Sequence, residues 1–245
     1  MADIIAAANG GDPVAENALG IKYAQGESGL PHDNAKAVEL YQDSARQGYD
    51  KAETNLADMF FFGRGGLAQS YAAALSWYLK AAQQGSPDAQ YRLGYMYENG
   101  LGADKDAQRA VQFYRSSAEH GNAEAENVLG ILYATGSGGV TEDYKQAVTW
   151  YQKSADQGDA KAEKNLGDMY FFGRGVDLDY RQALVWYGKA ADQQFADAQF
   201  RLGYMYEKGL GVTADETAAL DLYKKAASNG SVEAQRAIDR LSRGQ

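Results

Sequence analysis

The residues of this sequence that could take part in chemistry are aromatic and charged side chains that occur twice in the same order. The run that begins at Asp58 reads Asp-Met-Phe-Phe-Phe-Gly-Arg-Gly, and it returns at 168–175 with one Phe replaced by Tyr. The run Arg-Leu-Gly-Tyr-Met-Tyr-Glu at 92–98 returns unchanged at 201–207. Large aromatic side chains beside a few charges are typical of a binding groove when they line a solvent-facing surface. The repeated runs therefore favour a binding function over a catalytic one.

The residue patterns of common catalytic and metal sites do not occur in the sequence. The chain has no cysteine, and its two histidines, His32 and His120, stand alone. It contains no histidine pair at zinc spacing, no phosphate-binding loop and no Ser-x-x-Lys motif of the kind found in β-lactamases. We therefore expect no catalytic residue, no metal site and no cofactor.

The charge balance bears on the class of partner. The formal net charge is −9 and the isoelectric point is about 4.8. This argues against nucleic acid and anionic membranes, because both attract basic surfaces. It suits a basic or neutral protein or peptide ligand, and a solvated acidic surface that only aids solubility is the alternative.

The sequence also bears on the compartment. No apolar run reaches the length of a membrane span, so we expect no membrane insertion. No basic start followed by an apolar core marks a signal peptide. We expect a bacterial periplasmic or secreted location if an N-terminal signal has been removed, and a cytoplasmic location otherwise.

The chain repeats itself every 36 or 37 residues. A Leu-Gly pair, once Leu-Ala, begins at Leu19, Leu56, Leu93, Leu129, Leu166 and Leu202. A tyrosine keeps the same step at Tyr41, Tyr78, Tyr114, Tyr151, Tyr187 and Tyr223. A fixed period of this size predicts a stacked array, whose function is carried by surfaces.

Each repeat reads as two helices joined by a glycine-rich turn. Glycine in a helix costs about 1 kcal/mol against alanine, so the recurring Leu-Gly pair predicts close approach of the partner helix. Thr213 and Glu216 have the spacing of a capping box at the start of a second helix. Glycines suited to a left-handed end follow five of the second helices, at Gly48, Gly85, Gly121, Gly158 and Gly230. Gln194 interrupts this series, so we expect a strained or differently shaped corner there.

The pattern Ala-x-x-x-Leu-Gly-x-x-Tyr-x-x-Gly-x-Gly, followed by Ala-x-x-x-Tyr-x-x-Ala-Ala-x-x-Gly, resembles the Sel1-like repeat, a relative of the tetratricopeptide repeat. The resemblance implies an all-α, right-handed superhelical α-solenoid whose first helices line the concave side. It also implies an adaptor or peptide-binding role, often in bacteria. Some bacterial members carry a disulfide in each repeat, and this chain departs from that branch because it has no cysteine.

We expect a single α-solenoid domain over 1–245, with about 13 helices and no sheet. Residues 1–12 resemble the end of a second helix and form a partial repeat or cap. Residues 231–245 form a C-terminal capping helix that turns Arg236, Asp239, Arg240 and Arg243 to water. The repeats between them are 13–48, 49–85, 86–121, 122–158, 159–194 and 195–230. The first three match the last three, so a three-repeat block has been copied, by natural duplication or by design.

The register of the resemblance predicts which first-helix residues face the concave side. The ligand-binding candidates are Asp58, Phe61, Phe62, Tyr91, Tyr95, Glu98, Asp168, Phe171, Phe172, Phe200, Tyr204 and Glu207. Thr54 and Lys164 occupy further concave positions. An alternative is that the adjacent phenylalanines pack under the turn of the next repeat. Tyr95 and Tyr204 are expected to be exposed, because neighbouring Met and Tyr residues can cover the interior.

Arginines beside these candidates have two interpretations. Arg64 and Arg174, which lie between turn glycines, could bind an acidic group of a ligand or the last carbonyls of the first helix. Arg92 and Arg201 are expected to pair with the aspartates of the copied block.

Three functions remain open on the sequence alone. The first is a non-enzymatic scaffold that binds a peptide or partner segment on its concave face. The second is a structural or engineered array without a natural ligand. The third is a small-molecule binder or weak hydrolase like the cysteine-rich relatives, which the missing catalytic residues disfavour. A continuous concave stripe of exposed aromatics would favour the first over the second.

Overall fold

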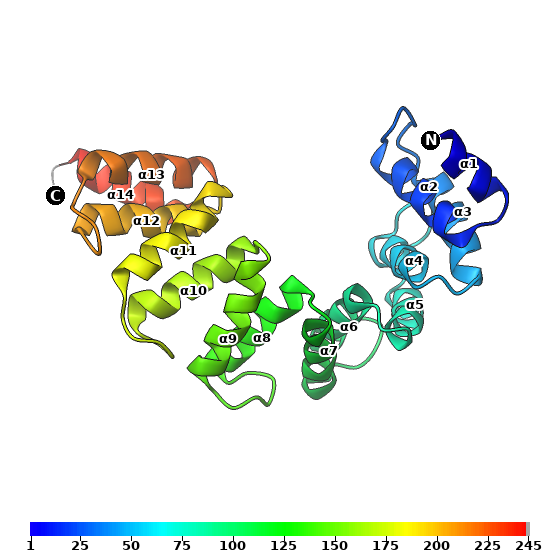
Figure 1. Cartoon of the computed structure of the whole chain (residues 1–245), viewed down its shortest axis with the longest axis horizontal. Helices are drawn as coiled ribbons and strands as arrows, with labels where there is room; N and C mark the ends of the chain where they lie inside the picture. Colours follow the sequence, from blue (N-terminus) through cyan, green and yellow to red (C-terminus); the bar gives the residue numbers. More distant parts are fainter. Residues whose placement is uncertain (244–245) are drawn as a thin grey trace. The chain divides into compact units, whose positions relative to one another are not determined.

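The computed structural model describes residues 1–243, and over that range it is helical without strands. The chain divides into two compact units, Met1–Asn122 and Ala123–Gln245, and each is described by itself. The first unit contains α1 (Ala2–Asn9), α2 (Pro13–Gln25), α3 (Asn34–Arg46), α4 (Asp50–Phe62), α5 (Tyr71–Gln83), α6 (Pro87–Asn99) and α7 (Ala107–Glu119) (Figure 1). The second contains α8 (Ala123–Thr135), α9 (Tyr144–Asp156), α10 (Ala160–Phe172), α11 (Tyr180–Asp192), α12 (Ala196–Lys208), α13 (Glu216–Ser228) and α14 (Val232–Ser242).

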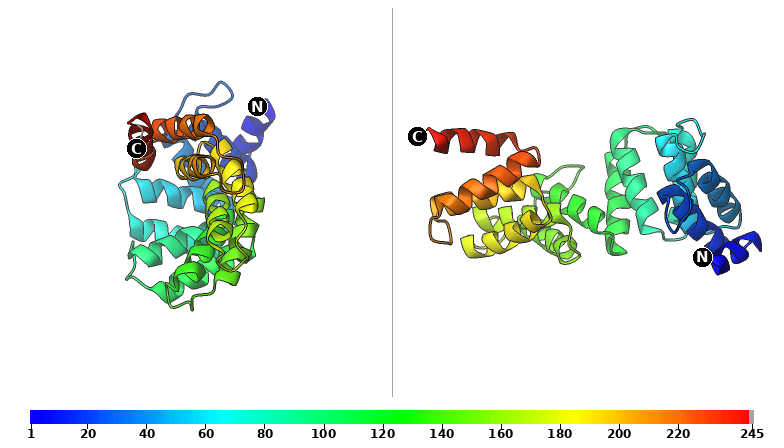
Figure 2. Two further views of the ribbon diagram at one scale, coloured as in Figure 1. Left: turned by 90° about the vertical axis from the view of Figure 1, so that its left-hand side faces the viewer. Right: turned by 90° about the horizontal axis from the view of Figure 1, so that it is seen from above.

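The described residues thus form fourteen helices, one more than the sequence predicted. The even-numbered helices from α2 to α12 are the first helices of the six repeats, the odd-numbered helices from α3 to α13 are the second helices, and α1 and α14 lie at the two ends. Each first helix packs along the second helix that follows it. Figure 2 shows the helices from two further sides. The all-α repeat architecture with a helix at each end is confirmed.

In every repeat, an acidic or hydroxyl residue caps the N-terminus of the second helix. These residues accept a hydrogen bond from a backbone N–H of the first turn, at Asp33, Ser70, Asp106, Asp143, Asp179 and Asp215. The capping box expected from Thr213 is wrong, because Asp215 is the cap and accepts from the Ala218 amide at 2.9 Å. Glu216 is the first residue of the helix, so a carboxylate two positions nearer the helix takes the role.

The second helices end as their glycines predicted. Gly48, Gly85, Gly121 and Gly158 have φ angles between 81° and 89°, and Gly230 has 96°. Gln194 adopts the same left-handed conformation, with φ at 63°. A residue with a Cβ atom is strained there. The expected strained corner is confirmed.

The recurring Leu-Gly glycines allow the second helix to approach closely. A Cβ atom on Gly20 would lie 2.7 Å from the ring of Tyr41, and one on Gly94 would lie 2.6 Å from the ring of Tyr114. The same contact recurs between Gly130 and Tyr151, Gly167 and Tyr187, and Gly203 and Tyr223. The two sequence series are therefore two sides of one contact, repeated along each unit.

The last described helix covers the end of the second unit. Ala234 and Ala237 of α14 are buried against α13. The expectation that Arg240 faces water is wrong in part, because its guanidinium donates to the Glu207 carboxylate at 2.5 Å. Residues 244 and 245 of the predicted capping helix lie outside the described residues.

Candidate functional site

Four aromatic rings gather where α4 ends against α5 and α6. We call Phe61, Phe62, Tyr71 and Tyr95 the first aromatic cluster. The Phe61 ring centroid lies 4.9 Å from that of Phe62, 5.1 Å from that of Tyr71 and 6.3 Å from that of Tyr95. The first two contacts are edge-to-face, the arrangement that aromatic rings favour. Phe61 therefore contacts the other three rings of the cluster and fixes their positions.

The second unit contains the same arrangement. We call Phe171, Phe172, Tyr180 and Tyr204 the second aromatic cluster. The Phe171 centroid lies 4.8 Å from that of Phe172, 5.3 Å from that of Tyr180 and 6.4 Å from that of Tyr204. The repeated sequence runs thus build the same local geometry in each unit.

Adjacent phenylalanines in each cluster have different environments. Phe61 is buried, with 9% of its surface exposed, whereas Phe62 is 43% exposed. In the second unit Phe171 is half-buried and Phe172 is 45% exposed. Each alternative raised by the sequence therefore describes one member of the pair: the first phenylalanine packs and the second is presented to solvent.

The two candidate tyrosines also differ from each other. Tyr95 is 41% exposed, as the sequence predicted. Tyr204, its counterpart, is only half-buried rather than fully presented to solvent. The first cluster therefore offers more tyrosine surface than the second.

Turn arginines lie over the exposed phenylalanines. The guanidinium carbon of Arg64 lies 4.7 Å from the centroid of Phe62, and that of Arg174 lies 5.2 Å from the centroid of Phe172. Among the described residues, neither guanidinium is hydrogen-bonded to the last carbonyls of the first helix. Both side chains are exposed and keep their N–H donors available to a ligand.

The aspartates of the copied runs contact a tyrosine of their own repeat and an arginine of the next repeat. In the first unit the Tyr78 hydroxyl donates to Asp58, and Arg92 lies 3.5 Å from the same carboxylate. Burial raises the pKa of Asp58, while Tyr78 and Arg92 oppose that rise. The expected pairing of Arg92 with Asp58 is confirmed.

The counterpart aspartate has one more partner. The Tyr187 hydroxyl donates to Asp168 at 2.6 Å, and Lys164 pairs with the same carboxylate at 2.8 Å. Arg201 lies 3.9 Å away, which confirms the second predicted pair. Lys164 has no counterpart in the first unit, where Thr54 is buried and donates to the Asp50 carbonyl.

The candidate glutamates also join the two helices of a repeat. Glu98 accepts a hydrogen bond from the Tyr114 hydroxyl at 2.7 Å, and Glu207 accepts one from Tyr223 at 2.8 Å. Burial acts to raise the pKa of Glu207, but hydrogen bonds from Arg240, Lys208 and Tyr223 outweigh it and lower that pKa to about 2. These carboxylates primarily stabilise the repeat.

The remaining candidates, Tyr91 and Phe200, are half-buried. Their rings lie 5.8 Å from Tyr114 and 5.6 Å from Tyr223. Phe200 also lines a hollow of about 240 Å³ across α10, α12 and α14, together with Lys164, Asp197, Arg201 and Glu233. This hollow carries both cations and carboxylates, so it has no single charge preference.

A row of polar pairs, each between a buried glutamate and an exposed glutamine, was missed by the sequence reasoning. Near the start of a first helix, Glu16, Glu53, Glu126 and Glu163 accept hydrogen bonds from the amides of Gln47, Gln84, Gln157 and Gln193 at 2.7–2.9 Å. Burial raises the pKa of these glutamates. The signal was present, since a Glu and a Gln recur at fixed positions of the repeat. The pairs tie the first helix to the end of the second.

Residues 1–243 contain no group of three or more histidine, cysteine, aspartate or glutamate residues suited to hold a metal ion. None of the described helices is long and apolar enough to cross a membrane.

A family model for the Sel1 repeat matches six consecutive segments of the chain, 13–49, 50–86, 87–122, 123–159, 160–195 and 196–231. The chain belongs to the Sel1 repeat family. Proteins of this family generally mediate protein–protein interactions and are generally non-enzymatic. A comparison with curated proteins finds no match.

Solved bacterial structures of Sel1 repeat proteins are similar to this chain. A protective antigen of uropathogenic Escherichia coli is 37% identical with a TM-score of 0.84, over 97% of this chain and 50% of that one. The chain thus spans about half the length of that antigen. A Sel1 repeat protein from Oxalobacter formigenes is 36% identical with a TM-score of 0.82, over 88% of this chain and 87% of that one. An immunity protein from Pseudomonas aeruginosa, 23% identical over 86% of this chain and 82% of that one, shares the fold with a TM-score of 0.56.

Proposed function

We propose that this Sel1 repeat protein is a non-enzymatic scaffold that holds a peptide or partner segment on its first-helix surface, with an aromatic cluster as the contact in each unit. The observation that carries the proposal is the exposed phenylalanine beneath an arginine, Phe62 under Arg64 and Phe172 under Arg174. Exposed aromatics beside arginine are the side chains that contribute most to protein binding.

The side chains of the clusters indicate which kind of partner segment would bind there. A large apolar side chain would cover the exposed phenylalanine, and a neighbouring carboxylate would accept hydrogen bonds from the arginine above it. The net charge of −9 suggested a basic or neutral ligand, but the exposed charges at both clusters are arginines. Local charge decides a contact because distant surface charges are screened by salt. We therefore favour an apolar segment that carries an acidic group.

The two clusters make the proposed binding bivalent. A short peptide should bind twice per chain, once at each cluster, and loss of one cluster should leave the other site intact. A longer segment that reaches both clusters would bind once and more tightly, because its second contact is intramolecular.

Selection of random peptides on the intact protein tests this function. Peptides selected on the chain should lose roughly 30-fold or more in affinity, the size expected for binding hot spots, when both clusters are removed. The variant for this purpose combines Phe62→Ala, Tyr95→Ala and Phe172→Ala. Val185→Ala is the control, since Val185 is 51% exposed on α11 outside both clusters.

Two results would contradict the proposal. One is that the selected peptides bind the cluster variant and the control equally well, with both variants folded by circular dichroism. The other is that no peptide is selected at all, which would favour the alternative of a structural array without a ligand.

A further inference from the structure

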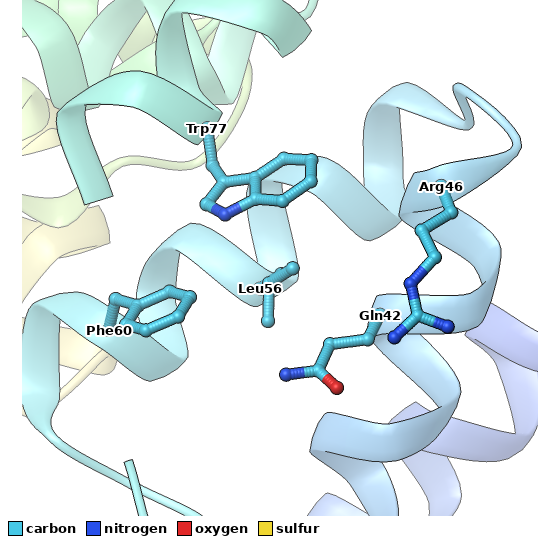
Figure 3. Close-up of a pocket in the computed structure, with 5 residues that line it drawn as sticks. All are labelled: Gln42, Arg46, Leu56, Phe60 and Trp77. Atoms are coloured by element: carbon cyan, nitrogen blue, oxygen red, sulfur yellow. The ribbon is translucent and has the colours of Figure 1, made fainter. Parts of the chain in front are cut away.

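A second hollow lies in the first unit, between two second helices. Gln42 and Arg46 of α3 form one side, Trp77 of α5 and Phe60 of α4 form the other, and Leu56 of α4 lies between them (Figure 3). Its volume is about 200 Å³. An apolar cavity of about 150 Å³ is large enough for benzene, so this hollow has room for one large apolar side chain.

This hollow is separate from the first aromatic cluster. Phe60 and Phe62 are two positions apart on α4, and two positions correspond to a rotation of about 200° around a helix. Phe60 and Leu56, four positions apart, share a face instead. The exposed ring of Phe62 therefore belongs to one side of α4, and the hollow belongs to the other.

The walls of the hollow are apolar and ordered by packing. Leu56 is 1% exposed and belongs to the core of the first two repeats, while Phe60 and Trp77 are half-buried against that core. An apolar ligand would remove the open faces of both rings from water, at about 25 cal/mol for each Å² covered. The hollow is thus built to hold an apolar group rather than a polar one.

Charged side chains lie on the rim of the hollow. Arg46 pairs with Asp43 at 2.7 Å, but both side chains are more than half exposed. This bond occupies one of the five N–H donors of the arginine, so the others are open to a ligand. The Lys80 ammonium lies 3.8 Å from the Trp77 ring centroid. Of the exposed charges beside the hollow, Arg46 and Lys80 are positive and Asp43 is negative, while the buried Glu53 also lies near enough to Lys80 for that ammonium to lower its pKa.

We propose that this hollow is a second binding site, which takes one large apolar side chain from a partner segment with carboxylates on either side of it. The apolar side chain fills the space over Leu56 between Phe60 and Trp77. The flanking carboxylates accept hydrogen bonds from Arg46 and lie near Lys80. This site does not depend on the proposed function of the aromatic clusters, because it uses other residues on another face.

The second unit provides an internal comparison. The residues that correspond to the lining are Gln152, Asp156, Leu166, Tyr170 and Trp186. An aspartate therefore replaces Arg46, and it accepts a hydrogen bond from Gln152 at 2.7 Å. Trp186 is only 7% exposed. Lys153 stands where the first unit has Asp43, and the Lys189 ammonium lies 3.9 Å from the Trp186 ring centroid. The two places therefore carry the same balance of these charges in a different order, and the second offers less indole surface.

Fluorine NMR on the whole chain labelled with 5-fluorotryptophan tests the proposal, because the chain has three tryptophans, Trp77, Trp150 and Trp186. Trp77→Phe assigns the first signal. The probe is the blocked tripeptide Glu-Phe-Glu, compared with Glu-Ala-Glu and Lys-Phe-Lys. We expect Glu-Phe-Glu alone to shift the Trp77 signal in a saturable way, with the other two indole signals unchanged.

Substitution of the rim arginine separates charge from packing. Arg46→Asp, which introduces the residue type of the second unit, should weaken Glu-Phe-Glu on the order of fivefold, the size of an exposed ion pair. Arg181→Asp makes the same change of net charge at an exposed position on α11 and should leave the titration unchanged.

Four outcomes would overturn the proposal. Glu-Phe-Glu could leave the Trp77 signal unmoved up to its solubility limit. Glu-Ala-Glu or Lys-Phe-Lys could shift it equally. Arg46→Asp could have no more effect than Arg181→Asp. Finally, a shift of the Trp77 signal with protein concentration alone would identify a second copy of the chain as the occupant.

Discussion

Gly167 of α10 lies so close to the ring of Tyr187 in α11 that a Cβ atom on Gly167 would be 2.7 Å from both Cδ1 and Cε1 of the tyrosine. The hydroxyl of the same tyrosine donates to Asp168, the residue next to the glycine. The contact therefore combines close packing of two helices with a hydrogen bond between them. Ala57 at the equivalent place in the second repeat is fully buried, so that helix pair accommodates one methyl group.

Gly167→Ala should destabilise the protein by about 1–3 kcal/mol, because the added methyl must displace the Tyr187 ring. Gly188→Ala is the matched control within the same helix pair, since a Cβ atom there meets nothing within 4 Å. That change should be neutral or stabilise by up to about 1 kcal/mol through helix propensity. Urea unfolding followed by circular dichroism measures both, and equal effects would refute the packing role of Gly167.

Gln194→Gly should stabilise the second unit. Gln194 holds a φ of 63°, and the left-handed region costs a residue with a side chain about 1–2 kcal/mol. Glycine removes most of this strain, and it already serves the corresponding corner of the other repeats. The reverse change, Gly158→Gln, should destabilise by a similar amount, which thermal melting of both variants can check. A lower melting temperature for Gln194→Gly would show that the glutamine side chain makes a compensating contact.

Phe61→Ala and Phe62→Ala should differ although the residues are adjacent. Phe61 is buried among three rings, so its loss should cost about 3 kcal/mol of unfolding free energy. Phe62 is 43% exposed, so its loss should cost no more than about 1 kcal/mol. Denaturant midpoints of the two variants measure this difference. Equal costs would mean that Phe62 is packed and unavailable to a ligand.

Glu207 should make stability fall in acid. Its pKa is lowered to about 2 from an ordinary value of 4.5, so the folded state binds the charged form better than the unfolded chain does. The contribution is present above pH 4.5 and is lost as pH falls toward 2. Glu207→Gln should cost about 1.5–3 kcal/mol at neutral pH, the range for hydrogen bonds to charged groups, and little at pH 2. Glu98→Gln is the control, since Glu98 has no ion pair among the described residues. If Glu98→Gln lowers the unfolding free energy as much as Glu207→Gln does, the ion pair with Arg240 does not contribute to stability.

Glu126 should have the opposite pH dependence. Burial raises the pKa of this glutamate, so folding favours its protonated form, and that contribution is lost as pH rises through the folded-state pKa. Glu126→Gln keeps an acceptor for the Gln157 amide, as Gln199 does for Asn229 at 3.0 Å. The variant should be at least as stable as the parent at neutral pH and lose its advantage in acid. Stability measured from pH 4 to 8 checks this, and a large loss at pH 7 would mean that the charge itself is required.

The sequence by itself determined the helical repeats, the close contact at the Leu-Gly pair and the left-handed corner at Gln194. These features depend on local backbone preference and on a period that each repeat states again, so six copies reinforce each signal. The copied runs also located the aromatic clusters and the pairs that Arg92 and Arg201 form. The repeated order of residues was enough to single these features out, although Arg92 and Asp58 lie in adjacent repeats.

Only the tertiary structure decided which candidates pack and which are presented to solvent. Helical spacing places Phe60, Phe61 and Phe62 on successive faces of α4, but the elements packed beside α4 decide what covers each face. The sequence therefore did not predict that Phe61 is buried, that Phe62 lies under Arg64, or that Phe60 lines a separate hollow. The same holds for Arg240, which reaches a glutamate 33 residues away in the chain. Contacts between helices depend on how whole repeats stack, and the order of residues in one helix does not contain that information.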